Sequence, residues 1–150
     1  MRTSFALLAA LAFSACDYEQ EDAASFGGFV DVPPQVTAGV PFSIRLGATQ
    51  SMPIASAEVI IYSGDLGRSP ASPGFSGDTL SVVPVDVKPG LRTFETAVMA
   101  TVPVGSVSAP SEEVGVALVV HEFPCSGPGP ACGGPASITS RTVAQPGLRD

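Results

Sequence analysis

Alternation with a period of two is the pattern that most constrains the fold of this chain. In residues 42–46 and 114–120, apolar side chains alternate with small, polar or less bulky ones. Such alternation is typical of a strand with one buried face. Helical spacing is not sustained anywhere after residue 16, and the 16 glycines and 15 prolines of the chain recur between the apolar runs. Because these residues break helices and mark turns, the pattern favours strands throughout.

The apolar runs and turn signals together predict an all-β fold. We expect strands at residues 35–38, 42–46, 57–62, 79–87, 94–102, 114–120 and 137–143. About seven short strands with turns between them, over roughly 120 residues, are typical of a single antiparallel β-sandwich.

A local motif narrows this expectation. Residues 32–44, with the sequence VPPQVTAGVPFSI, resemble the opening of many bacterial immunoglobulin-like domains, where an Ala-Gly turn separates an edge strand from the second strand. The run at 94–105 is similar in character. The resemblance implies an immunoglobulin-like sandwich. The chain departs from that family in having no tryptophan and no inter-sheet cysteine pair, so a jelly roll or a partly open barrel remains an alternative.

The first residues have the layout of a secretory signal peptide. Arg2 precedes an uninterrupted apolar run, Phe5 to Phe13, and small residues follow. A helix of this length is roughly 14 Å long, whereas the hydrocarbon core of a bilayer is about 30 Å thick. We therefore expect residues 1–15 to be a cleaved signal peptide rather than a membrane-spanning helix.

The end of this segment carries a second motif. Phe13-Ser-Ala-Cys16 resembles the lipobox of bacterial lipoproteins, with Phe13 where leucine is commonest. The resemblance implies a diacylglyceryl thioether on Cys16, cleavage before it, and acylation of the new amino terminus. Two or more acyl chains hold a protein stably on a membrane. We expect lipid anchoring on the extracytoplasmic side of the cell membrane or outer membrane, with ordinary secretion and cleavage near Ala15 as the alternative.

The mature chain is acidic. Residues 16–28 combine acidic side chains with a closing glycine pair, which is typical of a flexible tether with a reach of about 20 Å. Residues 29–150 would then form the sandwich domain. Without Arg2, six basic residues face fourteen acidic ones, a formal charge of about −8 with the amino terminus acylated. Because the six are scattered, we expect no nucleic-acid partner, and membrane association through the lipid alone.

Two cysteines remain after lipidation. Cys125 and Cys132 lie in a segment rich in glycine and proline, and an oxidising compartment permits their pairing. We expect a structural disulfide, which would stabilise the fold by about 2.5 kcal/mol. A redox pair or a zinc site is the alternative, although redox motifs usually have two intervening residues and zinc would need two further ligands.

The residues that usually perform catalysis are sparse. His121 is the only histidine, and the alternation places it on the side of its strand shared with Glu113, Ala117 and Val119. We expect a partly exposed side chain without a functional role. No nucleophile-elbow motif supports a Ser-His-Asp triad, and a copper site of the two-histidine type is excluded by the count. The sequence thus predicts no catalytic residue, no cofactor, no metal site and no enzymatic activity.

One stretch is a candidate surface feature. Residues 63–78 have no periodicity, and loops of this length are usually functional or disordered. We expect disorder, with a partner-contact loop using Arg68 and Phe75, or a calcium site using Asp65 and Asp78, as alternatives. Substitution of Arg68 and Phe75 together is expected to leave the melting temperature nearly unchanged.

These observations predict a non-catalytic binding or structural module of the cell envelope, attached to the membrane through Cys16, with another envelope protein as its partner. The alternative is an envelope hydrolase or ligand-binding lipoprotein whose site is built from non-adjacent carboxylates.

Overall fold

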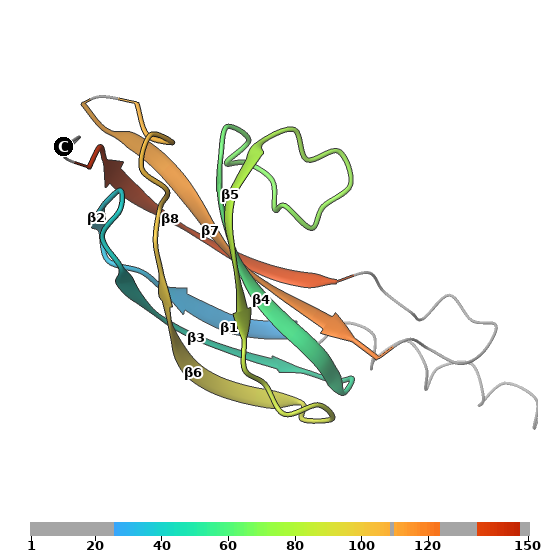
Figure 1. Cartoon of the computed structure of the whole chain (residues 1–150). Coiled ribbons are helices and arrows are strands. Elements are labelled where there is room, and N and C mark those ends of the chain that lie inside the picture. The colour runs from blue at the N-terminus through green and yellow to red at the C-terminus, as the bar shows by residue number, and fades with distance from the viewer. Residues whose placement is uncertain (1–25, 109, 124–134, 148–150) are drawn as a thin grey trace, which may run out of the picture.

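All regular structure described for this protein is β-strand. A computed structural model describes residues 26–108, 110–123 and 135–147 (Figure 1). The strands are β1 (Phe26–Asp31), β2 (Gln35–Thr37), β3 (Phe42–Gln50), β4 (Ile54–Ser63), β5 (Asp78–Val85), β6 (Thr93–Ala100), β7 (Glu112–Glu122) and β8 (Ala136–Gln145). The all-β prediction is confirmed. Within the described ranges, no helix has the length and apolar character needed to cross a membrane.

The strands form two sheets. One has three strands in the order β1-β3-β6, and the other has five in the order β2-β8-β7-β4-β5. Their pairings are antiparallel except that β2 runs parallel to β8, with Gln35 opposite Val143. The expectation of a purely antiparallel arrangement is corrected at this point. Pro33 and Pro34 separate β1 from β2, and because proline cannot donate a ladder hydrogen bond, the chain leaves the first sheet there and joins the second.

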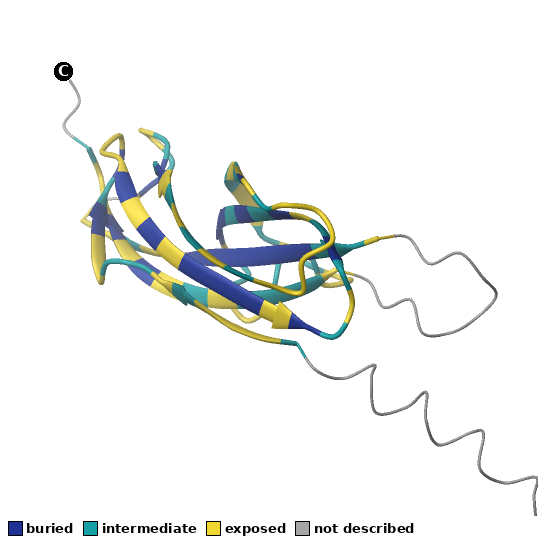
Figure 2. Cartoon of the chain, turned by 90° about the horizontal axis from the view of Figure 1, so that it is seen from below, coloured by how far each residue is buried: buried dark blue, intermediate teal, exposed yellow. Residues whose placement is uncertain are grey.

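The two sheets share one hydrophobic core. Ile44 and Leu46 of β3 are fully buried, as are Val59 of β4 and the stripe of Val114, Val116, Leu118 and Val120 in β7. All of these residues belong to one cluster, to which β1, β5 and β6 add partly buried side chains. Figure 2 shows the consequence as buried and exposed segments along the strands. The period-two stripes read from the sequence therefore mark the core-facing residues.

β1 was not among the strands expected from the sequence. Phe26 lies opposite Gln50 and Gly28 opposite Ala48, so Phe26, Gly27 and Gly28 are paired in the sheet, although we expected them to belong to the tether of residues 16–28. A Cβ atom at Gly28 would overlap the carbonyl oxygen of Gly47. This close backbone approach requires glycine, and it leaves no side-chain alternation from which the strand could be recognised.

Candidate functional site

A second apolar cluster lies on the side of the five-stranded sheet that faces away from the core. Tyr62, Ala117 and Val119 are at most 1 % exposed, although they alternate with core-facing residues. They are buried because the connection between β4 and β5, residues 64–77, folds back over them with Leu66, Ala71 and Phe75. We call this connection the covering loop. Its packing corrects the expectation of a disordered segment.

The centre of the cluster is the ring of Tyr62. Tyr62 lies opposite Gly115 in the β4–β7 pairing, and a Cβ atom at Gly115 would overlap the ring. The other side of the ring meets Phe75 edge-on, with the ring centroids 5.5 Å apart and an interplanar angle of 82°. Edge-to-face geometry is favourable for aromatic pairs. Tyr62 thus occupies a position that the missing side chain of Gly115 opens and that Phe75 closes.

Polar contacts hold the covering loop on the sheet. The guanidinium of Arg141 on β8 donates to the carbonyl of Leu66 at 3.2 Å and pairs with Glu113 on β7 at 3.1 Å. Within the loop, a carboxylate oxygen of Asp65 accepts from the backbone N–H of Ser76 at 3.3 Å and from its hydroxyl at 3.2 Å. The first of these contacts holds the start of the loop on the sheet, and the second ties the two ends of the loop together.

The two residues expected to contact a partner differ in their exposure. Arg68 is exposed and donates to the carbonyl of Gly74 at 2.6 Å, whereas Phe75 is half-buried against Tyr62. Because Phe75 packs on Tyr62, we now expect the joint substitution of Arg68 and Phe75 to lower the melting temperature, contrary to the expectation from the sequence. Asp65, expected as one ligand of an alternative calcium site, is engaged with Ser76. In the described part of the chain, no three His, Cys, Asp or Glu side chains come together as a metal site would require.

Burial also perturbs the acidity of Tyr62. Removal of its hydroxyl from water raises its pKa above the ordinary value of 10.0. The positive charge of Arg141 and a side-chain hydrogen bond with Thr139 act in the opposite direction, and the negative charge of Asp65 adds to the increase. The phenol is therefore neutral at physiological pH, and it loses its proton less readily than an exposed tyrosine.

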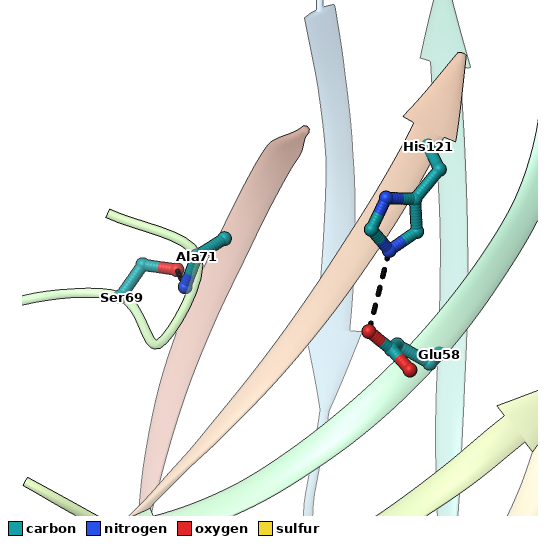
Figure 3. A network of polar contacts seen from close by, with 4 residues as sticks. All are labelled: Glu58, Ser69, Ala71 and His121. Carbon is teal, nitrogen blue, oxygen red and sulfur yellow. Dashed lines mark hydrogen bonds and ion pairs between the residues drawn. The ribbon is translucent and has the colours of Figure 1, made fainter. Parts of the chain in front are cut away.

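The same outer face carries a histidine–glutamate pair. Nε2 of His121, on β7, lies 3.2 Å from a carboxylate oxygen of Glu58 on β4, and the two side chains point toward one another (Figure 3). Their side chains are 41 % and 34 % exposed, so the pair contributes only about 0–1 kcal/mol to stability. The partly exposed position of His121 is confirmed.

In the covering loop, the hydroxyl of Ser69 accepts from the backbone N–H of Ala71 at 3.2 Å, which closes a local turn.

Sequence reasoning missed the partner of His121 and the role of Tyr62. Glu58 and Tyr62 both occupy outer positions of β4, and their partners come from β7, more than fifty residues later. A pattern of alternation shows which residues share a face of one strand, but it does not show which strand lies beside it. Gly115 interrupts a run of branched residues in its own strand. This interruption is the one local signal that a large side chain from a neighbouring strand lies over the position.

Three predicted residues lie outside the described ranges. These are Cys16, the expected lipid attachment site, and Cys125 and Cys132, the expected disulfide pair. The lipid and the disulfide both remain predictions.

No protein-family model and no curated protein matches this chain. Solved structures do match it. A superoxide reductase (neelaredoxin) from Ignicoccus hospitalis is 13 % identical with a TM-score of 0.43, covering 79 % of this chain and 80 % of its own. A single-substitution variant of that protein is 14 % identical with a TM-score of 0.44, covering 83 % and 85 %. At such values the likeness assigns no activity to this chain.

The functional expectation is not retained. The similar structures are named as superoxide reductases, and neither name describes a non-catalytic binding or structural module or its alternative, a hydrolase or ligand-binding lipoprotein. The expectation that the chain is not an enzyme likewise gains no support from them.

Proposed function

We propose that this chain works at a membrane surface, as an extracytoplasmic protein anchored by lipid on Cys16, with a folded part that is one immunoglobulin-like sandwich. The observation that carries the proposal is the Phe13-Ser-Ala-Cys16 motif directly after a short apolar run. The position of β1 agrees with it. From Cys16 to Phe26 the chain spans at most about 35 Å when fully extended, so the start of the sandwich stays close to any anchor on Cys16.

The strand order supports the immunoglobulin-like part of the proposal. Immunoglobulin sandwiches place strands A, B, E and D in one sheet, and C, F and G, with C′ in the variable type, in the other. β1, β3 and β6 match A, B and E, without a counterpart of D in that sheet among the described residues, and β5, β4, β7 and β8 match C′, C, F and G in that spatial order. β2 then corresponds to the part of the first strand that crosses to the second sheet.

Phase partitioning tests the anchor. The full-length chain, expressed with its signal peptide in a bacterium that acylates lipoproteins, is expected to enter the detergent phase, because two or more acyl chains dominate its partitioning. The Cys16→Ala variant should accumulate as unprocessed precursor or appear in the aqueous phase. Identical processing and partitioning of both chains would contradict lipid attachment at Cys16.

The exposed position of Arg68 supports a second proposal, that its guanidinium contacts an acidic group on another protein of the envelope. Arg68 lies in the covering loop and is exposed, and its bond to the carbonyl of Gly74 uses only one of the guanidinium nitrogens. A photo-crosslinking residue at position 68 should capture a partner in cells. The same residue at Ser43, exposed on β3 of the other sheet, serves as the control. Equal products from both positions would count against the contact.

A further inference from the structure

Three connections meet at the end of the sandwich where β1 starts. Phe26 lies opposite Gln50, the last residue of β3. The backbone of Ile54, which begins β4, accepts a hydrogen bond from Gly90 at 2.9 Å and donates one to Leu91 at 2.8 Å. Ile54 also lies opposite Glu122, the last residue of β7. The connections after β3 and β5 and the carboxyl end of β7 therefore share one end of the molecule with the start of β1 (Figure 1). We call it the β1-start end.

Large apolar side chains are exposed at this end. Met52 is 39 % exposed, Leu91 44 % and Phe123 46 %, and each comes from a different connection. Leu91 follows Gly90, which has a φ of +94° in a tight turn. A Cβ atom at Gly90 would meet nothing within 4 Å, so this turn is open to its surroundings.

Exposed apolar groups of this kind can mark a contact surface. Val40 and Val104 are also exposed, at the opposite end, so exposure alone does not distinguish the two ends. What distinguishes the β1-start end is the start of β1, where the chain from Cys16 arrives.

Basic residues flank the apolar tip. Lys88 and Arg92 are both exposed, on either side of Leu91. Long cationic side chains beside apolar ones suit the boundary of a bilayer, where the stems lie along acyl chains and the charges reach phosphate oxygens. Asp86, in the connection after β5, and Glu122, at the end of β7, are acidic, so attraction of this end to anionic headgroups is nearly balanced by repulsion. Apolar contact would then provide most of the binding.

We propose that the β1-start end docks on the bilayer, with Met52, Leu91 and Phe123 entering the interface and Lys88 and Arg92 meeting the lipid phosphates. This inference rests on the proposed lipid anchor, which would hold this end within about 35 Å of the bilayer and so raise its effective concentration there. It revises the sequence-based expectation that the lipid alone makes the membrane contact. The covering loop, which follows the opposite end of β4, would remain clear of the membrane.

Single tryptophans test the docking, because the chain has none of its own. The lipid-anchored chain carrying Leu91→Trp is reconstituted into vesicles of phosphatidylethanolamine and phosphatidylglycerol, with and without bromine on the acyl chains. The matched control is Val104→Trp, which is 59 % exposed in the connection after β6, at the opposite end. Leu91→Trp should shift its emission to shorter wavelength and lose about half of it to brominated lipid, whereas Val104→Trp should do neither.

Flotation of the same vesicles separates the possible failures. If the chain floats with the vesicles and Leu91→Trp is not quenched, the anchor stands and the docking is wrong. Equal quenching at both positions would also overturn the docking, since it shows no preferred end. If the chain does not float, the lipid anchor fails and the inference fails with it. The emission of Leu91→Trp could also shift as protein concentration rises while brominated lipid leaves it unquenched. Such a result would show that a second copy of the chain covers this end, and it would contradict the proposal.

Discussion

At the scale of single residues, Gly115 and Tyr62 depend on each other. A methyl group at position 115 would displace the Tyr62 ring from the sheet and from Phe75. Gly115→Ala should therefore lower the free energy of unfolding by about 1–3 kcal/mol, the usual cost of overpacking. The matched control is Gly27→Ala, also in a strand, where a Cβ would meet nothing within 4 Å. Urea denaturation of both variants measures the difference, and equal midpoints would contradict the proposed packing.

Tyr62 also makes stability depend on pH in the alkaline range. In the unfolded chain its hydroxyl titrates near 10, whereas burial raises the pKa in the folded protein. As pH rises above about 10, the unfolded state loses this proton first, so the stabilisation present below pH 10 is lost progressively up to the folded pKa. Urea midpoints between pH 9 and 11 should fall more steeply for the native chain than for Tyr62→Phe. Parallel slopes would show that Tyr62 is not the group responsible.

Residue-level features divide into those visible in the sequence and those that depend on the fold. The core positions Ile44, Leu46 and Val116 follow from alternation alone, because a strand with one buried face repeats every second residue. The outward direction of His121 follows in the same way. Its pairing with Glu58 does not, because the β4–β7 register is a property of the whole sheet.

At the scale of elements, the covering loop has a position that its own sequence does not indicate. Phe75 packs on Tyr62, and Arg141 on β8 holds the backbone of Leu66. Without periodicity in residues 64–77, nothing local distinguishes a loop fixed on a sheet from a disordered one. β1 could not be predicted for a related reason. Its glycines pair through the backbone and provide no alternation of side chains.

Phe75→Ala tests whether the loop is held by packing. Loss of the ring should destabilise the protein by about 2 kcal/mol, less than a fully buried phenylalanine because Phe75 is half-buried. It should also speed hydrogen exchange at Ala117 and Val119 beneath the loop. Arg68→Ala, an exposed change in the same loop, should shift stability by less than about 0.5 kcal/mol. Equal stabilities of the two variants would mean that the loop is not part of the cooperative unit.

At the scale of the whole molecule, the two ends of the sandwich differ in which of them receives the chain from Cys16. The β1-start end combines the start of β1 with the exposed Leu91, Met52 and Phe123, while the covering loop follows the opposite end of β4. The sequence predicted the all-β class and the anchor motif, but not this polarity, because residues 52, 91 and 123 become neighbours only through strand pairing. An anchor on Cys16 would orient the sandwich on the membrane, with the β1-start end toward the bilayer.

Mass spectrometry of the amino-terminal peptide tests that anchor most directly. The protein is extracted with detergent from the membranes of bacteria that express the full-length chain, and its first peptide is sequenced and weighed. Lipid attachment at Cys16 predicts a peptide that begins at Cys16 and carries a diacylglyceryl group on sulfur and an acyl chain on the amino terminus. A peptide that begins elsewhere, or an unmodified Cys16, would contradict it.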